Sequence, residues 1–115
     1  MHEMHLNHEP FLAIKNGTKT IELRLLDEKR RNIRVNDSIL FKDRLTHEEI
    51  QVRVIALHIY PNFSLLYKHF DPIVLGYSKE ENALAEDMEV FYPIESQEKY
   101  GVVGIEIGAV GKLSN

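Results

Sequence analysis

The charged residues of one short stretch, NGTKTIELRL at positions 16–25, have types and a spacing that could bind a ligand. Lys19 and Arg24 could contact phosphate, and an arginine can also pair with a base or stack on it. Glu22 could accept hydrogen bonds from an amino group or a ribose hydroxyl. A carboxylate between two cations argues against a site that only clamps phosphate. The alternative is an exposed strand in which Glu22 and Arg24 form a weak pair, worth at most about 1 kcal/mol.

Other residue types that often carry chemistry give weaker patterns. His2, His5 and His8 are spaced by three, but in a strand this spacing places His5 on the opposite face from the other two. The chain has no cysteine, and none of its serines lies in a nucleophile-elbow sequence. It also lacks a G-x-G-x-x-G sequence and a Walker loop. We therefore expect no metal and no cofactor, and a serine or cysteine hydrolase is disfavoured.

A basic segment follows shortly after the first group of charges. It contains Lys29, Arg30, Arg31 and Arg34, and it could contact the backbone of an RNA, above all through Arg30 and Arg31. A solvated loop of mixed charge explains the same residues, because two acidic residues precede them. The net charge of the chain is −4, so any contact with a nucleic acid must come from a local patch of this kind.

The size and composition of the chain predict a single domain, residues 1–115. Hydrophobic residues make up 43% and charged residues 28%, which is typical of a folded globular protein rather than a disordered one. No apolar run approaches the roughly 20 residues of a membrane span. The start, MHEMHLNHEP, lacks the features of a secretory signal. We therefore expect a cytoplasmic protein with no membrane partner, and the sequence does not indicate its oligomeric state.

Alternation and turn residues predict the elements that position the charged stretch. A first strand could begin at residues 4–6, and Pro10 suits the first turn of a short helix. That helix should end at Asn16–Gly17, where glycine can adopt the left-handed conformation. Residues 19–25 then alternate as a strand, with one face formed by Ile21, Leu23 and Leu25. Because Lys19 follows the turn directly, the turn rather than the strand should set its direction.

The rest of the chain predicts further strands and two more helices. Strands are expected at residues 38–42, 50–59 and 100–108, with the second half of 50–59 apolar on both faces. Asn62 could cap one helix, and Ser78 with Glu81 could begin another. The buried stripe of that last helix would be Leu84, Met88 and Phe91. About five strands and three short helices without βαβ alternation predict an α+β fold around a small mixed or antiparallel β-barrel.

The complete spacing Gly17-x-Lys19-x-x-Glu22-x-Arg24 resembles the signature of the activating signal cointegrator homology (ASCH) domain. The continuation LRLLDEKRRNIRVNDSILF is similar to the basic loop and second strand of this family, with Asn36 where glycine is commoner. The segment MEVFYPIESQEKYGVVGIEI is similar to its C-terminal part. The resemblance implies a PUA-like β-barrel. It also implies a cleft lined by the lysine, the glutamate and the arginine, which binds RNA or a nucleoside- or nucleotide-like molecule.

The resemblance also leaves an enzymatic alternative open. Some small proteins of this kind are amidohydrolases that deacetylate acetylcytidine with a lysine, a threonine and a glutamate. Lys19 matches the lysine, but Glu22 stands at the threonine position, and the segment PIVLGYS has no carboxylate where the glutamate is expected. Thr20 could substitute for the threonine. In a hydrolase, Lys19 would be the nucleophile or base, Glu22 would tune its proton affinity and Arg24 would hold the substrate.

Two residues near the C-terminus are further candidates for the same cleft. In the family, the segment before the last strand approaches the cleft, which makes Glu95 and Tyr100 candidate ligand-binding residues. A tyrosine there could stack on a base. The alternative is an ordinary polar loop whose tyrosine packs over the end of the barrel.

Overall fold

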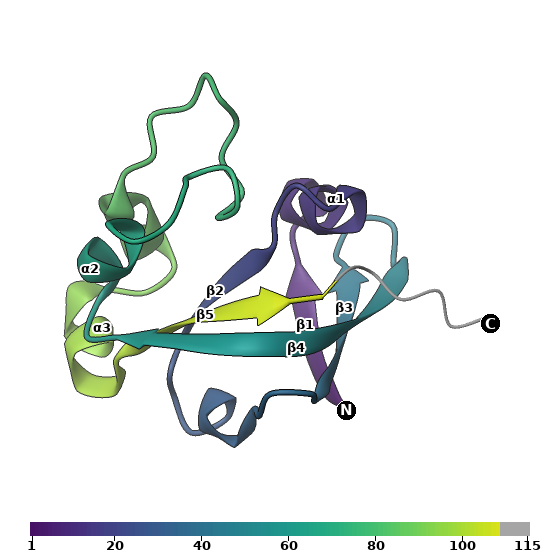
Figure 1. Ribbon diagram of the computed structural model, residues 1–115, viewed down its shortest axis with the longest axis horizontal. Helices are drawn as coiled ribbons and strands as arrows, with labels where there is room; N and C mark the ends of the chain where they lie inside the picture. The colour runs from purple at the N-terminus through teal and green to yellow at the C-terminus, as the bar shows by residue number, and fades with distance from the viewer. Residues whose placement is uncertain (109–115) are drawn as a thin grey trace.

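The computed structural model describes residues 1–108, and its centre is a five-stranded sheet (Figure 1). In the order β1-β3-β4-β5-β2, the sheet pairs β1 and β3 in parallel and all other neighbours antiparallel. The strands are β1 (His2–Leu6), β2 (Ile21–Leu25), β3 (Ser38–Asp43), β4 (Glu49–Tyr60) and β5 (Val102–Ile107). The sheet curls into a half-barrel, which confirms the predicted α+β fold around a small mixed sheet.

The two edge strands, β1 and β2, are joined by the first helix, α1 (His8–Asn16). The helix ends where predicted, because Gly17 has a φ of 85° and its N–H donates to the carbonyl of Ile14. The next two residues, Thr18 and Lys19, both donate their N–H groups to the carbonyl of Ala13. The chain is thus folded back tightly before β2 begins, and the direction of Lys19 is fixed by this turn.

Two apolar clusters hold the sheet and its helices together. The first lies inside the half-barrel and includes Phe11, Ile14, Ile39, Phe41 and Ile105. The second packs β2 and β5 against the segment that follows β4, and includes Ile21, Leu23, Phe63, Leu66 and Leu75. Strand β2 therefore contributes its predicted apolar face to a core.

The second half of β4 has an apolar sequence on both faces, but it is not buried on both. Ile55 is 49% exposed and Ile59 is 59% exposed. The pairing register of β4 with β5 shifts between Val54 and Ala56. The alternation of side chains between the two faces of the strand is therefore interrupted there. This irregularity cannot be seen in the alternation of the sequence alone.

The helices after β4 match the prediction only in part. Asn62 caps α2 (Phe63–Tyr67) as predicted, with its side-chain oxygen accepting from the N–H of Leu65 at 2.9 Å. The backbone N–H of Ser78 does donate to the carboxylate of Glu81, but no helix starts there. In its place a short 3₁₀ helix, η2 (Ala85–Val90), is preceded by irregular chain.

Of the buried stripe predicted for that helix, only Met88 packs against the second apolar cluster, and the chain forms a further helix that was not predicted. Leu84 and Phe91 are 41% and 59% exposed, so they are not core residues. Pro93 directly precedes α3 (Ile94–Tyr100), so Glu95 and Tyr100 lie in a helix and the alternative of an ordinary polar loop is wrong. The side chain of Gln97 is buried in α3 and accepts from the N–H of Phe63, which ties α3 to α2.

The basic segment forms another short helix, η1 (Arg30–Asn32), and the turn before β3 has Asn36 at a φ of 79°. This left-handed conformation is one that glycine adopts readily and that asparagine tolerates better than most residues. Among the described residues, no helix combines the length and the apolar character that a membrane crossing requires.

Candidate functional site

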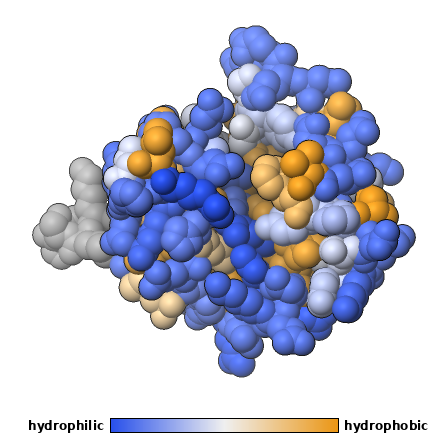
Figure 2. Space-filling model, turned by 180° about the vertical axis from the view of Figure 1, so that it is seen from behind, coloured by the Kyte–Doolittle hydropathy of each residue, from blue (hydrophilic) through white to orange (hydrophobic). Residues whose placement is uncertain are grey.

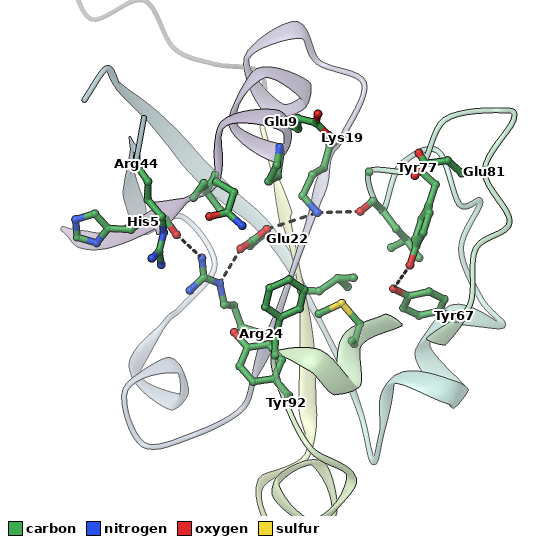
Figure 3. Close-up of a pocket in the computed structure, with 18 residues that line it drawn as sticks. His5, Glu9, Lys19, Glu22, Arg24, Arg44, Tyr67, Tyr77, Glu81 and Tyr92 are labelled. Atoms are coloured by element: carbon green, nitrogen blue, oxygen red, sulfur yellow. Dashed lines mark hydrogen bonds and ion pairs between the residues drawn. The ribbon is translucent and has the colours of Figure 1, made fainter. Parts of the chain in front are cut away.

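A pocket of about 350 Å³ lies along the open side of the half-barrel, between the two edge strands and the segment that follows β4. Its wall includes residues of β1 and α1, the start of β2, and positions between 67 and 92. Figure 2 shows a face of the molecule that is hollowed near its centre, with apolar surface inside a mostly hydrophilic rim. The lining includes the charged or ionisable side chains of His5, Glu9, Lys19, Glu22, Arg24, Arg44 and Glu81, and those of Tyr67, Tyr77 and Tyr92 (Figure 3).

Lys19, Glu22 and Arg24 form one connected group at the base of this pocket. The two oxygens of Glu22 contact different cations, with Oε1 3.5 Å from Lys19 Nζ and Oε2 2.7 Å from Arg24 Nε. Lys19 Nζ also donates to the carbonyl of Leu75 at 2.8 Å, and Arg24 Nη2 donates to the carbonyl of His5 at 3.2 Å. Lys19 and Glu22 are only 6% and 5% exposed. The interpretation of this stretch as an ordinary exposed strand is therefore wrong.

The fold explains how Lys19, Glu22 and Arg24, which are unequally spaced in the sequence, meet at the base of the pocket. Glu22 and Arg24 share a face of β2, as alternation predicts, while Lys19 reaches the same face because the turn after Gly17 directs it. Arg24 spans the opening between the edge strands by bonding to His5 of β1. The charged group therefore lies where the barrel fails to close.

Close approach of the chain at Gly76 completes the base of the pocket. Gly76 has a φ of +112°, and a Cβ built on it would lie 3.1 Å from Lys19 Cδ. Both the positive φ and the contact with Lys19 therefore favour glycine at this position. The neighbouring carbonyl of Leu75 can then reach the ammonium of Lys19.

Burial and charge shift the proton affinities of this group. Burial lowers the pKa of Lys19, and the attraction of Glu22 offsets this only in part. Burial alone would raise the pKa of Glu22, but Lys19 and Arg24 outweigh it and hold that pKa below its ordinary value. The pocket thus keeps a carboxylate ionised beside an amine whose protonated form is made less favourable.

Comparison with known proteins shows the family of the chain. The family model of the ASCH domain matches residues 4–110. The chain belongs to the ASCH domain family. No curated protein matches it.

Two solved structures resemble this ASCH domain over nearly its whole length. The crystal structure of hypothetical protein PH0355 is 35% identical with a TM-score of 0.70, and the match covers 91% of this chain and 94% of that one. The solution NMR structure of protein PF0455 from Pyrococcus furiosus is 34% identical with a TM-score of 0.68, covering 99% of this chain and 98% of that one.

The ASCH pocket is also lined by aromatic and apolar residues that the sequence did not mark as part of a site. Tyr67, Tyr77 and Tyr92 line it, together with Met88 and the exposed Phe91. Burial, with Tyr67 and Asp87 close to the hydroxyl, raises the pKa of Tyr77. Burial likewise raises the pKa of Tyr67. Since tyrosine is common in cores, nothing in the local sequence marked these residues as part of a site.

Other residues predicted for the site lie elsewhere in the ASCH domain. Thr20 does not line the pocket, and no other threonine does. Glu95 and Tyr100 belong to α3 and do not line the pocket either. The segment PIVLGYS has no carboxylate, but Glu81, three residues after it, lines the pocket.

The basic segment, His2 and His8 do not line the pocket, whereas His5 does. Arg30 pairs with Asp27 at 3.0 Å, and Arg31 Nε donates to the carbonyl of Leu26. Neither arginine lines the pocket. His8 bonds to the buried Asp43 at 2.6 Å. In residues 1–108, no three side chains of the metal-binding types come together as a metal site requires.

Proposed function

We propose that this pocket binds a nucleoside- or nucleotide-like ligand, either free or as an unpaired unit of an RNA. The observation that carries the proposal is the convergence of Lys19, Glu22 and Arg24 at the base of one pocket that has an aromatic wall. Such a pocket offers hydrogen bonds in the plane of a base and an apolar surface for its faces. Its volume of about 350 Å³ lies in the range of small-molecule sites.

The charge balance of the lining favours a polar ligand over a polyanion. Three carboxylates, Glu9, Glu22 and Glu81, face three cations, Lys19, Arg24 and Arg44. A site that binds phosphate alone would not place carboxylates among its cations. The ammonium and guanidinium groups can donate to ring nitrogens, carbonyls or a phosphate, and the carboxylates can accept from amino and hydroxyl groups.

Calorimetric titration with nucleosides and their 5′-monophosphates tests this proposal. We expect saturable binding, and we expect Arg24→Lys to weaken it about tenfold or more, because lysine keeps the charge but loses the planar fork. Arg53→Lys makes the same change at an exposed position of β4 and serves as the control. Binding that Arg24→Lys leaves unchanged would remove the charged group from the site.

RNA binding adds a role for the basic segment. If the ligand is an unpaired nucleotide of an RNA, the exposed Arg31 and the neighbouring Arg30 can contact its backbone. We expect Arg30→Glu with Arg31→Glu to lower the affinity for a single-stranded RNA and to flatten its dependence on salt. Affinity that does not change across a salt series would count against the patch.

Amide hydrolysis is the second candidate function, and the environment of Lys19 favours it. Burial lowers the pKa of this lysine, which increases the share of the neutral amine that can act as nucleophile or base. Glu22 lies 3.5 Å from the amine and would tune its proton affinity, and Arg24 would hold the substrate. The threonine of the known hydrolases has no counterpart in the pocket, because Thr20 lies outside it.

An assay with acetylcytidine separates the two functions. In a hydrolase, water cleaves the amide and releases cytidine and acetate, and Lys19→Ala abolishes turnover at saturating substrate. In a binding protein, the wild type shows no turnover, and Lys19→Ala lowers affinity. Wild-type hydrolysis that requires Lys19 would replace the binding proposal with the enzymatic one.

A further inference from the structure

Two tyrosine hydroxyls and a carboxylate form a chain of hydrogen bonds in the aromatic wall of the pocket (Figure 3). The hydroxyls of Tyr67 and Tyr77 are 2.8 Å apart. The hydroxyl of Tyr77 also lies 2.9 Å from Oδ2 of Asp87 and 3.4 Å from the carbonyl oxygen of Leu84. Both tyrosines line the pocket, whereas Asp87 does not.

The direction of the hydrogen bonds in this chain follows from the groups at its far end. A carboxylate and a carbonyl can only accept, so the single proton of the Tyr77 hydroxyl is directed toward Asp87 or Leu84. Tyr77 can then only accept from Tyr67. The hydroxyl proton of Tyr67 is therefore committed to Tyr77, and its oxygen offers only lone pairs to a ligand.

We propose that Tyr67 acts as a fixed hydrogen-bond acceptor that selects bases with an exocyclic amino group, as in adenine or cytosine, over bases with a carbonyl at the same ring position. This inference rests on the proposed binding of a nucleoside- or nucleotide-like ligand. Figure 3 places Tyr67 and Arg24 on opposite sides of Glu22. An amino group directed at Tyr67 thus leaves Lys19 and Arg24 to donate to the acceptors of the same ligand.

The same chain disfavours bases with a carbonyl in place of the amino group. A carbonyl oxygen facing Tyr67 would meet lone pairs, and neither group could donate to the other. Tyr67 could turn its proton toward the ligand only by withdrawing it from Tyr77. A site that is built to accept from an amino group rejects the analogue that lacks it, because its polar groups are then left unpaired.

Matched pairs of nucleosides test this inference by calorimetry. Cytidine and uridine differ in an amino group against a carbonyl, and so do adenosine and inosine. We expect the wild type to bind the amino member of at least one pair about tenfold more tightly, as expected when one hydrogen bond is replaced by an unpaired acceptor. Tyr67→Phe should bring the two affinities together by weakening the amino member.

Two further variants separate the direction of the chain from the mere presence of a hydroxyl. Tyr77→Phe removes the acceptor of Tyr67, whose proton is then free to point to the ligand, so affinity for uridine or inosine should rise. Tyr60→Phe removes a hydroxyl from a tyrosine that does not line the pocket, and it should keep the wild-type preference.

The possible outcomes distinguish this inference from the function on which it rests. Equal wild-type affinities within both pairs, or a preference that survives in Tyr67→Phe, overturn the role of Tyr67 while ligand binding by the pocket stands. Absence of binding by every nucleoside and nucleotide overturns the proposed function, and this inference falls with it.

Discussion

Two clusters of three charges lie on the same sheet, and they differ mainly in burial. At the base of the pocket, Glu22 lies between Lys19 and Arg24, with side chains 7–11% exposed. On the outer side of β1, β3 and β4, Lys42 lies 3.2 Å from Glu3 and 3.4 Å from Glu49, with side chains 33–57% exposed. The contact distances are similar, but water surrounds only the second cluster.

The comparison indicates that the buried cluster is kept for a reason other than stability. An exposed ion pair contributes roughly 0–1 kcal/mol, and a buried one often contributes no more than apolar residues of the same size would. Removing one partner of a buried pair lowers stability strongly, since the other charge is then left buried and unpaired. Lys19, Glu22 and Arg24 also line the pocket, where desolvated charges interact strongly with a ligand.

Removing a carboxylate should lower the free energy of unfolding far more in the buried cluster than in the exposed one. Glu22→Ala leaves Lys19 and Arg24 buried without their shared partner, and we expect the free energy of unfolding to fall by about 3–5 kcal/mol. Glu49→Ala, the matched change in the exposed cluster, should cost at most about 1 kcal/mol. Urea denaturation measures both, and equal losses would show that burial makes no difference.

Gly76→Ala tests how tightly the chain closes over the buried cluster. The added Cβ would meet Lys19, and the positive φ is strained for alanine, so we expect a loss of about 1–3 kcal/mol. Gly17→Ala is the control, because Gly17 also has a positive φ but nothing lies within 4 Å of an added Cβ. If both variants lose the same free energy, the contact with Lys19 contributes nothing.

As pH rises into the alkaline range, the contributions of Lys19 and Lys42 to folding stability should change in opposite directions. This is the smallest of the expected effects. The pKa of Lys19 is lowered by burial, so the unfolded chain binds more protons than the folded one, and Lys19 favours folding increasingly as pH rises toward 10.5. The pKa of Lys42 is raised by Glu3 and Glu49, so its contribution is present below 10.5 and is lost as pH rises through the raised pKa.

Stability curves of Lys19→Met and Lys42→Met against the wild type measure this difference. Relative to Lys19→Met, the wild type should gain stability between neutral pH and pH 10.5. Relative to Lys42→Met, it should lose stability above pH 10.5. Slopes of the same sign for the two lysines would contradict the assigned environments.

Much of the half-barrel and the first half of the site could be predicted from the sequence. Alternation located β2, and Gly17 marked the turn that directs Lys19, because both signals act within a few residues. The burial of Glu22 could not be seen locally. Alternation indicates that a polar face is exposed, but here the open side of the barrel is covered by chain that arrives from residues 75–92.

That covering segment is also where the sequence prediction failed. Residues 78–92 carry apolar side chains at helical spacing, yet Phe91 is exposed and only a short 3₁₀ helix forms. Pro93 stops a helix and can equally precede one, and here it precedes α3. Tyr67 and Tyr77 come from separate segments that meet only in the folded chain, so no local spacing could link them.

Mapping a nucleoside titration onto the backbone amides by NMR tests most directly whether the buried cluster is a ligand site. The measurement uses the full chain, with adenosine and cytidine as ligands and the exposed cluster as an internal control. We predict saturable shifts of the amides of residues 19–24 and 75–77, with those of Lys42 and Glu49 unchanged. Shifts that are confined to the exposed cluster, or no saturable shifts at all, would contradict the proposal.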